Sequence, residues 1–458
     1  MKETTLKQIA LWCGGKLDEQ YDNIVVSGIC TDSREVKPGN LFIPLVGAHF
    51  DGHNFLRRSM ENGAVAVLSS RAKIPEGIPT IFVDDTLTAF GAIATGYRES
   101  LPVKVLGITG SVGKTTTKEM LAAIMRKKFR TTWTVGNFNN NLGLPITVME
   151  IEEDTQVAVL ELGMNHFGEM AYLSRIAKPD AAIFTNIGTM HIEHLGSREG
   201  ILKAKLEILD GMKPDGSVIL NGDEPLLWNL NGTLDRKCYY FGIENPRCQI
   251  RATNIRSSDA GVHFHVTALS AEFDLFVPAN GNHTVYNALA AVTAAVLSGV
   301  DPETIQEALS SFENSGMRQK VYEQKGFTII EDCYNAGPES MAAALSVLGQ
   351  RSTTGRRIAV LGDMLELGSC SMAEHYRVGR LALHNADLIF AYGSNATRVV
   401  TGAVTGGMNA KNAMYYDDQD QLIHELKARA KPGDVLLFKG SRGMKMERVL
   451  ELFLKDEE

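Results

Sequence analysis

Residues 104–117, KVLGITGSVGKTTT, are the most informative segment of this chain. The segment opens with the apolar run KVLGIT, typical of a buried strand, and Thr115–Phe129 has the spacing of a helix. A glycine-rich turn joins the two. Because such a turn directs backbone N–H groups and a helix N-terminus toward an anion, this order of elements predicts a phosphate-binding loop.

The lysine and threonine after the glycines indicate the chemistry of this loop. Lys114 is expected to contact the β- and γ-phosphates of a nucleotide, and Thr115 to ligate Mg²⁺. The standard loop has a further glycine about six residues before the lysine. This chain has Ile108 there, so the loop is a shortened Gly-x-x-Gly-Lys-Thr version. The alternative is an ordinary glycine-rich turn with a chance Lys-Thr pair. ATP is favoured over GTP because no guanine-reading Asn-Lys-x-Asp follows.

Strands and helices alternate on the C-terminal side of the loop. Apolar runs at Val157–Leu160, Ala181–Thr185 and Ser217–Leu220 are separated by helical segments, which predicts a mainly parallel sheet covered on both faces. Residues 239–278 alternate like antiparallel strands, and Val285–Leu297 is an alanine-rich helix.

Length and pattern together predict three domains. The chain has 458 residues, and domains average roughly 150. Residues 1–84 form a small α/β unit, residues 85–313 hold the phosphate loop, and residues 314–458 return to a β-α-β rhythm. The expected fold class is α/β. It comprises a small N-terminal domain, a central domain with a mainly parallel sheet plus a small antiparallel sheet, and a Rossmann-like C-terminal domain.

Composition excludes several classes of protein. Lys+Arg is 46 and Asp+Glu is 54, giving a net charge of −8, which argues against general binding to nucleic acid or anionic membranes. No apolar run approaches the roughly 18 residues that span a bilayer, and the N-terminus lacks the apolar segment of a signal peptide. The six cysteines are scattered, as in a reducing compartment. We therefore expect a cytoplasmic protein.

A second group of polar residues is expected at the same end of the sheet as the loop. Glu161 follows one buried strand, and His191 lies in a histidine-rich loop after another. Ligands of open α/β sheets bind at these carboxyl ends. The two residues could complete the shell of one or two Mg²⁺ ions, although Mg²⁺ prefers oxygen to histidine. Purely structural roles are the alternative.

Several motifs, in their order, resemble those of the Mur ligases, the ATP-dependent amino-acid-adding enzymes of peptidoglycan synthesis. The resemblance runs nearly end to end. It rests on the loop GxxGKTTT, on the strand end at Glu161 and on three further segments, namely TVGNFNNNLGLP (134–145), TNIGTMHIEHLGS (185–197) and GNHTVYNALAA (281–291).

Three C-terminal motifs narrow the resemblance. The segments EDCYNAGPESM (331–341), LGDMLELG (361–368) and KGSRGMKME (439–447) look like the member that joins D-alanyl-D-alanine to UDP-N-acetylmuramoyl-tripeptide. The family usually has Asn where Gly337 stands. Two alternative functions stay open. One is another ligase, such as the folate-polyglutamating relatives, which lack the N-terminal Asp-Ser-Arg and Asp-Gly-His pattern. The other is a phosphate-loop regulatory ATPase.

The resemblance implies catalytic, ATP and metal residues. The implied catalytic residues are Lys114, His191 and Lys205. The implied ATP contacts are Thr109, Gly110, Ser111, Val112, Gly113, Lys114, Thr115, Thr116, Asn287, Arg318 and Asp332. The implied ligands of a pair of Mg²⁺ ions are Thr115, Glu161, His191 and Lys205, the last as a carbamate. A bare ammonium would repel Mg²⁺, whereas CO₂ addition makes an anionic oxygen ligand. A solvated helix lysine is the alternative for Lys205.

The resemblance also implies substrate contacts and a reaction. Ser33 and Arg34 match the UDP-binding edge, Asn139 and Asn140 a central substrate loop, and Asn335 the region that recruits the dipeptide. Turn support by Arg34 and loop capping by the two asparagines are the alternatives. The implied reaction activates the tripeptide carboxylate as an acyl phosphate, and the C-terminal domain closes on the central one. A monomer is implied. Lysine and diaminopimelate stay open as the third peptide residue.

Overall fold

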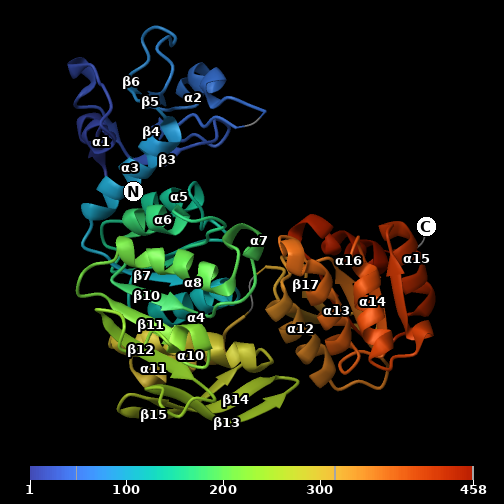
Figure 1. Cartoon of the computed structure of the whole chain (residues 1–458). Coiled ribbons are helices and arrows are strands. Elements are labelled where there is room, and N and C mark those ends of the chain that lie inside the picture. The colour runs from blue at the N-terminus through green and yellow to red at the C-terminus, as the bar shows by residue number, and fades with distance from the viewer. Residues whose placement is uncertain (48, 314–315, 456–458) are drawn as a thin grey trace.

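The computed structural model describes residues 1–47, 49–313 and 316–455. In this part of the chain, three mainly parallel sheets of four, nine and six strands lie in succession along the sequence. We refer to the units built on them as the N-terminal, central and C-terminal domains (Figure 1). The α/β fold class is confirmed. None of the helices described in these ranges is both long enough and apolar enough to cross a membrane.

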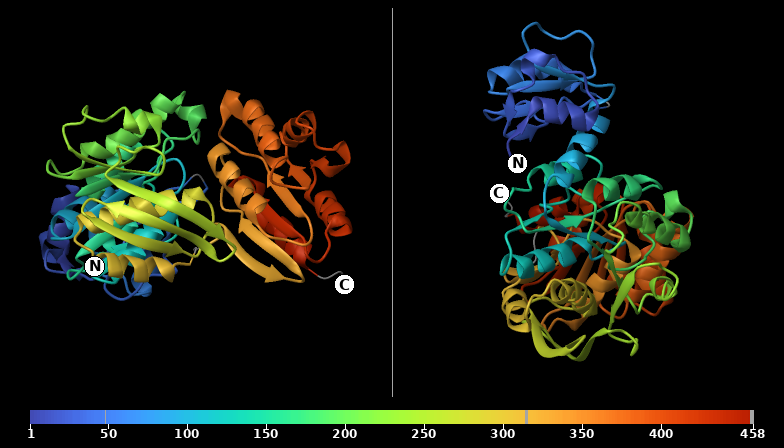
Figure 2. Two further views of the ribbon diagram at one scale, coloured as in Figure 1. Left: turned by 90° about the horizontal axis from the view of Figure 1, so that it is seen from below. Right: turned by 90° about the vertical axis from the view of Figure 1, so that its left-hand side faces the viewer.

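The N-terminal domain stands at one end of the molecule (Figure 2). Its parallel sheet has the order β3-β4-β5-β6, and β1 pairs with β2 beside it. Helix α3 (Thr86–Glu99) leads into the central domain, and its buried face joins the cores of the two domains. The other bounds are β1 (Thr4–Thr5), α1 (Leu6–Cys13), β2 (Val25–Val26), β3 (Gly28–Cys30), β4 (Asn40–Phe42), α2 (Leu56–Glu61), β5 (Ala66–Ser69) and β6 (Thr80–Phe82).

The central sheet has the order β15-β14-β13-β12-β11-β10-β7-β9-β8. Its strands are β7 (Lys104–Thr109), β8 (Thr131–Trp133), β9 (Val157–Glu161), β10 (Ala181–Phe184), β11 (Ser217–Asn221), β12 (Lys237–Gly242), β13 (Ile250–Ser258), β14 (Gly261–Ala268) and β15 (Ala271–Val277). Two details differ from expectation. Strand β12 pairs parallel to both neighbours, so residues 239–241 are not antiparallel. The antiparallel strands β13–β15 extend the large sheet instead of forming a separate one.

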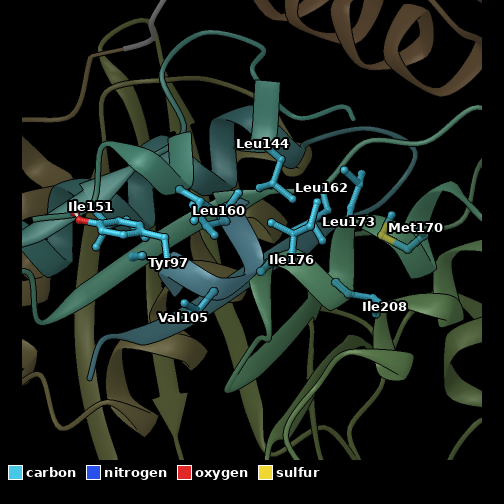
Figure 3. Packing of buried hydrophobic residues seen from close by; sticks show 14 of the residues in the cluster. Tyr97, Val105, Leu144, Ile151, Leu160, Leu162, Met170, Leu173, Ile176 and Ile208 are labelled. Atoms are coloured by element: carbon cyan, nitrogen blue, oxygen red, sulfur yellow. Dashed lines mark hydrogen bonds between the residues drawn. The ribbon is translucent and has the colours of Figure 1, made fainter. Parts of the chain in front are cut away.

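Both faces of the central sheet are covered, because successive strand residues point to opposite sides. Val105 of β7 packs on one face with Leu144 and Leu173 (Figure 3). Leu106 and Ile108 pack on the other face. The first face carries α5 (Gly143–Met149), α6 (Glu169–Ala177) and α8 (Arg198–Leu206), and the second carries α4 (Lys114–Arg126), α10 (Asn282–Leu297) and α11 (Pro302–Ser310). The short helices α7 (Ile192–Leu195) and α9 (Pro225–Trp228) complete the domain.

The C-terminal sheet has the order β16-β17-β21-β18-β19-β20 and is parallel except for the edge strand β16. Its strands are β16 (Lys320–Gln324), β17 (Phe327–Asp332), β18 (Arg357–Gly362), β19 (Leu388–Tyr392), β20 (Ala413–Tyr416) and β21 (Val435–Lys439). One face packs on α12 (Pro338–Gln350), α13 (Ser371–Ala382) and α14 (Ala396–Thr405), the other on α15 (Gln419–Arg429) and α16 (Met446–Leu454). The sequence predicted a boundary between the central and C-terminal domains after residue 313. The two residues that follow it, 314 and 315, lie outside the described residues.

Candidate active site

A cavity of about 840 Å³ lies between the central and C-terminal domains. The central domain lines it with the turn after β7, with Glu161 at the end of β9 and with the loop after β10. The C-terminal domain lines it with Asp332 and Lys439, the last residues of β17 and β21. The carboxyl ends of both parallel sheets therefore face one cavity, which is where ligands of such sheets bind.

The turn after β7 has the conformation of a phosphate loop. Gly113 has a φ of 83°, which is left-handed, and a Cβ built there would lie 2.3 Å from Asn287 Oδ1. Only glycine fits without strain or displacement of Asn287. Helix α4 begins at the next residue, so the N–H groups of its first turn have no intrahelical acceptor and carry the positive end of the helix dipole.

A neighbouring loop holds the phosphate loop in shape. Asn186 Oδ1 accepts hydrogen bonds from the N–H groups of Ser111 (3.2 Å) and Val112 (3.0 Å), and Gly188 N–H donates to Ser111 Oγ (2.9 Å). The Lys114 ammonium donates to the carbonyl of Gly110 at 2.8 Å. Burial lowers the pKa of Lys114, the charge of Glu161 opposes this, and the charge of Arg318 lowers it further. Asn186 had no assigned role, although it lies in the segment TNIG of the family-like motif.

Oxygen atoms converge beside the phosphate loop. The hydroxyl of Thr115 donates to Glu161 Oε2 (2.8 Å), and the amide of Asn139 donates to Glu161 Oε1 (2.8 Å). The backbone N–H of Glu161 donates to Thr134 Oγ1 (3.0 Å), which fixes the strand end. A hydroxyl and a carboxylate at this position fit a hard cation such as Mg²⁺. The described residues hold no cluster of three or more His, Cys, Asp or Glu side chains arranged for a metal.

Lys205 lies on α8. It is 2% exposed, and within the described ranges no hydrogen bond or ion pair of its ammonium is found. Burial, and then the charge of Lys114, lower the pKa of Lys205 well below its ordinary value. Lys205 is therefore not a solvated helix lysine. It does not belong to the residues that line the cavity itself.

His191 lines the cavity from the loop before α7. Its Nδ1 lies 2.6 Å from Glu366 Oε2 of the C-terminal domain. Burial lowers the pKa of His191, and the charge of Lys114 adds to this, against the opposite effect of Glu366. Burial and the nearby Lys114 charge therefore disfavour the imidazolium form, and one ring nitrogen is engaged by the other domain.

The C-terminal side of the cavity is built on a buried ion pair. Lys439 Nζ donates to Asp332 Oδ2 (2.7 Å) and to the carbonyl of Asn335 (2.9 Å). Since Asp332 and Lys439 are register partners in neighbouring parallel strands, their side chains emerge side by side. The Arg318 guanidinium lies 3.7 Å from the ring centroid of Tyr334 and also lines the cavity. Lys439 had no role assigned from sequence.

Family models and known proteins match this chain along its length. The models described as Mur ligase family, catalytic domain, as Mur ligase middle domain and as Mur ligase, glutamate ligase domain match residues 25–128, 108–295 and 317–442. A Bacillus subtilis (strain 168) protein named UDP-N-acetylmuramoyl-tripeptide--D-alanyl-D-alanine ligase is 41% identical over 456 residues, covering 98% of each chain. The chain belongs to the Mur ligase family. This confirms the resemblance seen in the sequence.

Further relatives of this Mur ligase span the same length. An Escherichia coli (strain K12) protein of the same name is 34% identical and covers 98% of each chain. A crystal structure of MurF from Acinetobacter baumannii superposes with a TM-score of 0.91 at 32% identity, covering 100% of both chains. The MurF ligase from Thermotoga maritima, solved in complex with ADP, has a TM-score of 0.82 at 29% identity, covering 93% of this chain and 97% of that one.

Most of the residues expected in the site of this Mur ligase line the one cavity. They are Ser111, Val112, Gly113, Lys114, Thr115, Thr116, Asn139, Asn140, Glu161, His191, Asn287, Arg318, Asp332 and Asn335. Asn287 is buried and accepts from Thr117 Oγ1 at 3.3 Å. Asn140 Oδ1 also accepts from Gly143 N–H (2.8 Å), so it caps the loop as the alternative interpretation held.

Five expected residues do not line the cavity, namely Lys205, described above, and four others. Thr109 is fully buried, with no hydrogen-bond partner for its hydroxyl, and Gly110 contributes its carbonyl to Lys114. Ser33 and Arg34 lie in the N-terminal domain. Arg34 binds its neighbour Asp32 through Nε (2.9 Å) and Nη2 (2.6 Å), which is the turn-supporting arrangement. That pair lowers the pKa of Asp32 to about 2.

Proposed function

We propose that this Mur ligase is an ATP-dependent, ADP-forming ligase that joins D-alanyl-D-alanine to UDP-N-acetylmuramoyl-tripeptide in peptidoglycan precursor synthesis. The observation that carries the proposal is the shared cavity. One wall is a phosphate loop and the other is the C-terminal Asp332–Lys439 pair, so two substrates can meet there. Relatives that match this chain along its whole length bear the name of this reaction.

The chemistry follows from the poor reactivity of a carboxylate toward an amine. A terminal carboxylate oxygen of the tripeptide attacks the γ-phosphorus of ATP, and ADP leaves. The amine of D-alanyl-D-alanine then attacks the acyl phosphate carbon, loses a proton, and expels phosphate with the carboxylate oxygen. Lys114 and Arg318, which both line the cavity, are placed to stabilise the negative charge that is transferred.

Metal binding is assigned to residues beside the phosphate loop. Thr115, Glu161, His191 and a carbamate on Lys205 would hold Mg²⁺, which supplies positive charge to the phosphates when bound. Burial and lowered pKa favour the neutral amine of Lys205 that reacts with CO₂, and the product is an anionic oxygen ligand. Mass spectrometry of the intact protein in bicarbonate should show one CO₂ adduct. The adduct should be lost in Lys205→Ala and kept in Lys203→Ala, whose side chain is exposed.

Each domain is assigned a ligand. Residues 1–84 bind the UDP end of the substrate through Ser33 and Arg34, with Arg34 exchanging Asp32 for the diphosphate. Residues 85–313 bind ATP and Mg²⁺, with Asn139 and Asn140 at the tripeptide. Residues 314–458 bind the dipeptide at Asn335 and close over ATP. The enzyme acts in the cytoplasm as a monomer.

A coupled assay of phosphate release tests the proposal. Release should require ATP, UDP-N-acetylmuramoyl-tripeptide and D-alanyl-D-alanine together, and other amino acceptors or a folate should not replace the last two. Steady phosphate release without the dipeptide would instead identify a regulatory ATPase. Activity with glutamate and a folate would identify a different ligase.

A further inference from the structure

Two glutamates of the C-terminal domain hold one loop of the central domain. Glu339, in the first turn of α12, accepts hydrogen bonds from the N–H (3.0 Å) and the hydroxyl (3.1 Å) of Thr189. Glu366 lies 2.6 Å from Nδ1 of His191 in the same loop. Figure 1 shows α7, which follows this loop, at the side of the central domain that faces the C-terminal domain. The contact between the domains therefore includes a residue expected to bind metal.

The segment that carries Glu366 is anchored within its own domain. The N–H of Met364 donates to His375 Nε2 (2.9 Å), and the N–H of Leu365 donates to Ser441 Oγ (2.9 Å). On the other side of Glu366, Leu367 is 2% exposed. The backbone that carries Glu366 is thus anchored within the C-terminal domain, and its side chain, 50% exposed, reaches His191 of the central domain.

The backbone at this contact is strained on both sides. His191 and Glu366 have φ values of 65° and 62°, left-handed conformations that cost a non-glycine residue about 1 kcal/mol or more. Gly368 packs so closely on Glu193 that a Cβ built there would lie 3.3 Å from the Glu193 side chain. Such strain persists where the surroundings over-determine a conformation. Here the two residues with this backbone conformation are the ones whose side chains meet between the domains.

The chemistry of the pair sets the protonation of the ring. An ionised carboxylate can only accept hydrogen bonds, so Nδ1 of His191 must carry the hydrogen. The lone pair of a neutral ring then lies on Nε2. Carboxylates commonly orient metal-binding histidines in this way. Here the carboxylate comes from the C-terminal domain and the histidine from the central domain.

We propose that Glu366 is a positioning residue that acts across the domain interface: it fixes the Nδ1–H tautomer and ring orientation of His191 and so presents Nε2 to the cavity only when the C-terminal domain is seated. The metal side of this inference rests on the proposed function, whereas the tautomer does not. Seating of the domain and completion of the metal site thereby become one event.

The first test uses metal-free full-length protein with ¹⁵N-labelled histidine. Imidazole nitrogen spectra, with His191 assigned by its loss in His191→Asn, should show hydrogen on Nδ1 in the wild type. Glu366→Ala should shift His191 to the Nε2–H form or to a mixture. Glu366→Gln, whose amide oxygen still accepts, should keep the Nδ1–H form. An unchanged tautomer in Glu366→Ala, or an Nε2–H wild type, overturns the proposal.

The second test measures the Mg²⁺ dependence of ADP release with all substrates present. Glu366→Ala should raise the Mg²⁺ concentration for half-maximal rate by about 10–100-fold, the usual effect of losing a partner of a metal-binding histidine. Glu366→Gln should recover most of this affinity. Glu425→Ala, which removes an exposed helix pair with Arg429, is the matched control and should leave it unchanged.

The outcomes separate the two proposals. A lower rate in Glu366→Ala with unchanged Mg²⁺ dependence overturns the positioning role. A wild type that releases no ADP overturns the proposed function, while the tautomer measured in metal-free protein still decides whether Glu366 orients His191.

Discussion

Replacing Lys439 with methionine should destabilise the C-terminal domain strongly. Lys439 is 2% exposed and bonds Asp332 at 2.7 Å and the Asn335 carbonyl at 2.9 Å. Methionine fills a similar volume but leaves the Asp332 carboxylate, itself 7% exposed, without its cation. Removing one partner of a buried ion pair costs about 3–5 kcal/mol. The free energy of unfolding of this domain should fall by about that amount.

The measurement must report on the C-terminal domain itself. The protein's tryptophans, Trp12, Trp133 and Trp228, all lie outside it, so their fluorescence would miss the change. Hydrogen exchange of peptides covering β17 and β21 reports the local opening free energy. The double variant Lys439→Met/Asp332→Asn removes both charges and should recover at least about 1 kcal/mol relative to the sum of the single changes. Protection within about 1 kcal/mol of wild type in Lys439→Met, or additive effects in the double variant, would show that no buried ion pair is present.

Three further changes test other parts of the site. Lys114→Ala should abolish ADP release, whereas Lys127→Ala, which removes an exposed pair with Glu307, should not; substantial turnover in Lys114→Ala would rule out the phosphate loop. Gly113→Ala should raise the KM for ATP at least tenfold, from about 1–2 kcal/mol of left-handed strain plus the displacement of Asn287. Gly136→Ala has similar strain but open space around it and should leave the KM for ATP nearly unchanged, so equal effects would contradict the clash. Cys333→Ser should keep full activity, and iodoacetamide at pH 8 should spare Cys333, because burial raises the pKa of its thiol; rapid labelling or an inactive serine variant would point to a chemical role.

Buried parallel strands were well predicted from sequence. The expected ranges of β7, β9, β10 and β11 agree with the structure to within one residue at each end, because strands covered on both faces are uninterrupted apolar runs. Elements without such a signal were not identified. β16 is an exposed edge strand with few apolar residues, and α14 and α16 begin without a side-chain cap. Helix α11 did carry a signal, since Asp301 caps it and Pro302 is its first residue.

The residues of the site also fall into those that the sequence predicted and those that it did not. Lys114, Thr115 and Glu161 follow from the order of strand, turn and helix, so local sequence places them together. Asn186 accepts hydrogen bonds from the phosphate loop across two adjoining loops, and this contact depends on how the loops fold against each other. Glu366 meets His191 from 175 residues away. A single sequence contains no pairing information over such separations, and these contacts depend on how two domains pack.

Transfer of a carboxylate oxygen to phosphate gives the decisive observation for the ligase reaction. The tripeptide substrate is prepared with ¹⁸O in its terminal carboxylate and incubated with ATP, Mg²⁺, D-alanyl-D-alanine and the full-length protein. Activation through an acyl phosphate predicts that each phosphate released carries one ¹⁸O atom, while the amide product retains the other. Phosphate without ¹⁸O would mean that water attacks ATP, and would contradict the assignment of this protein as a ligase.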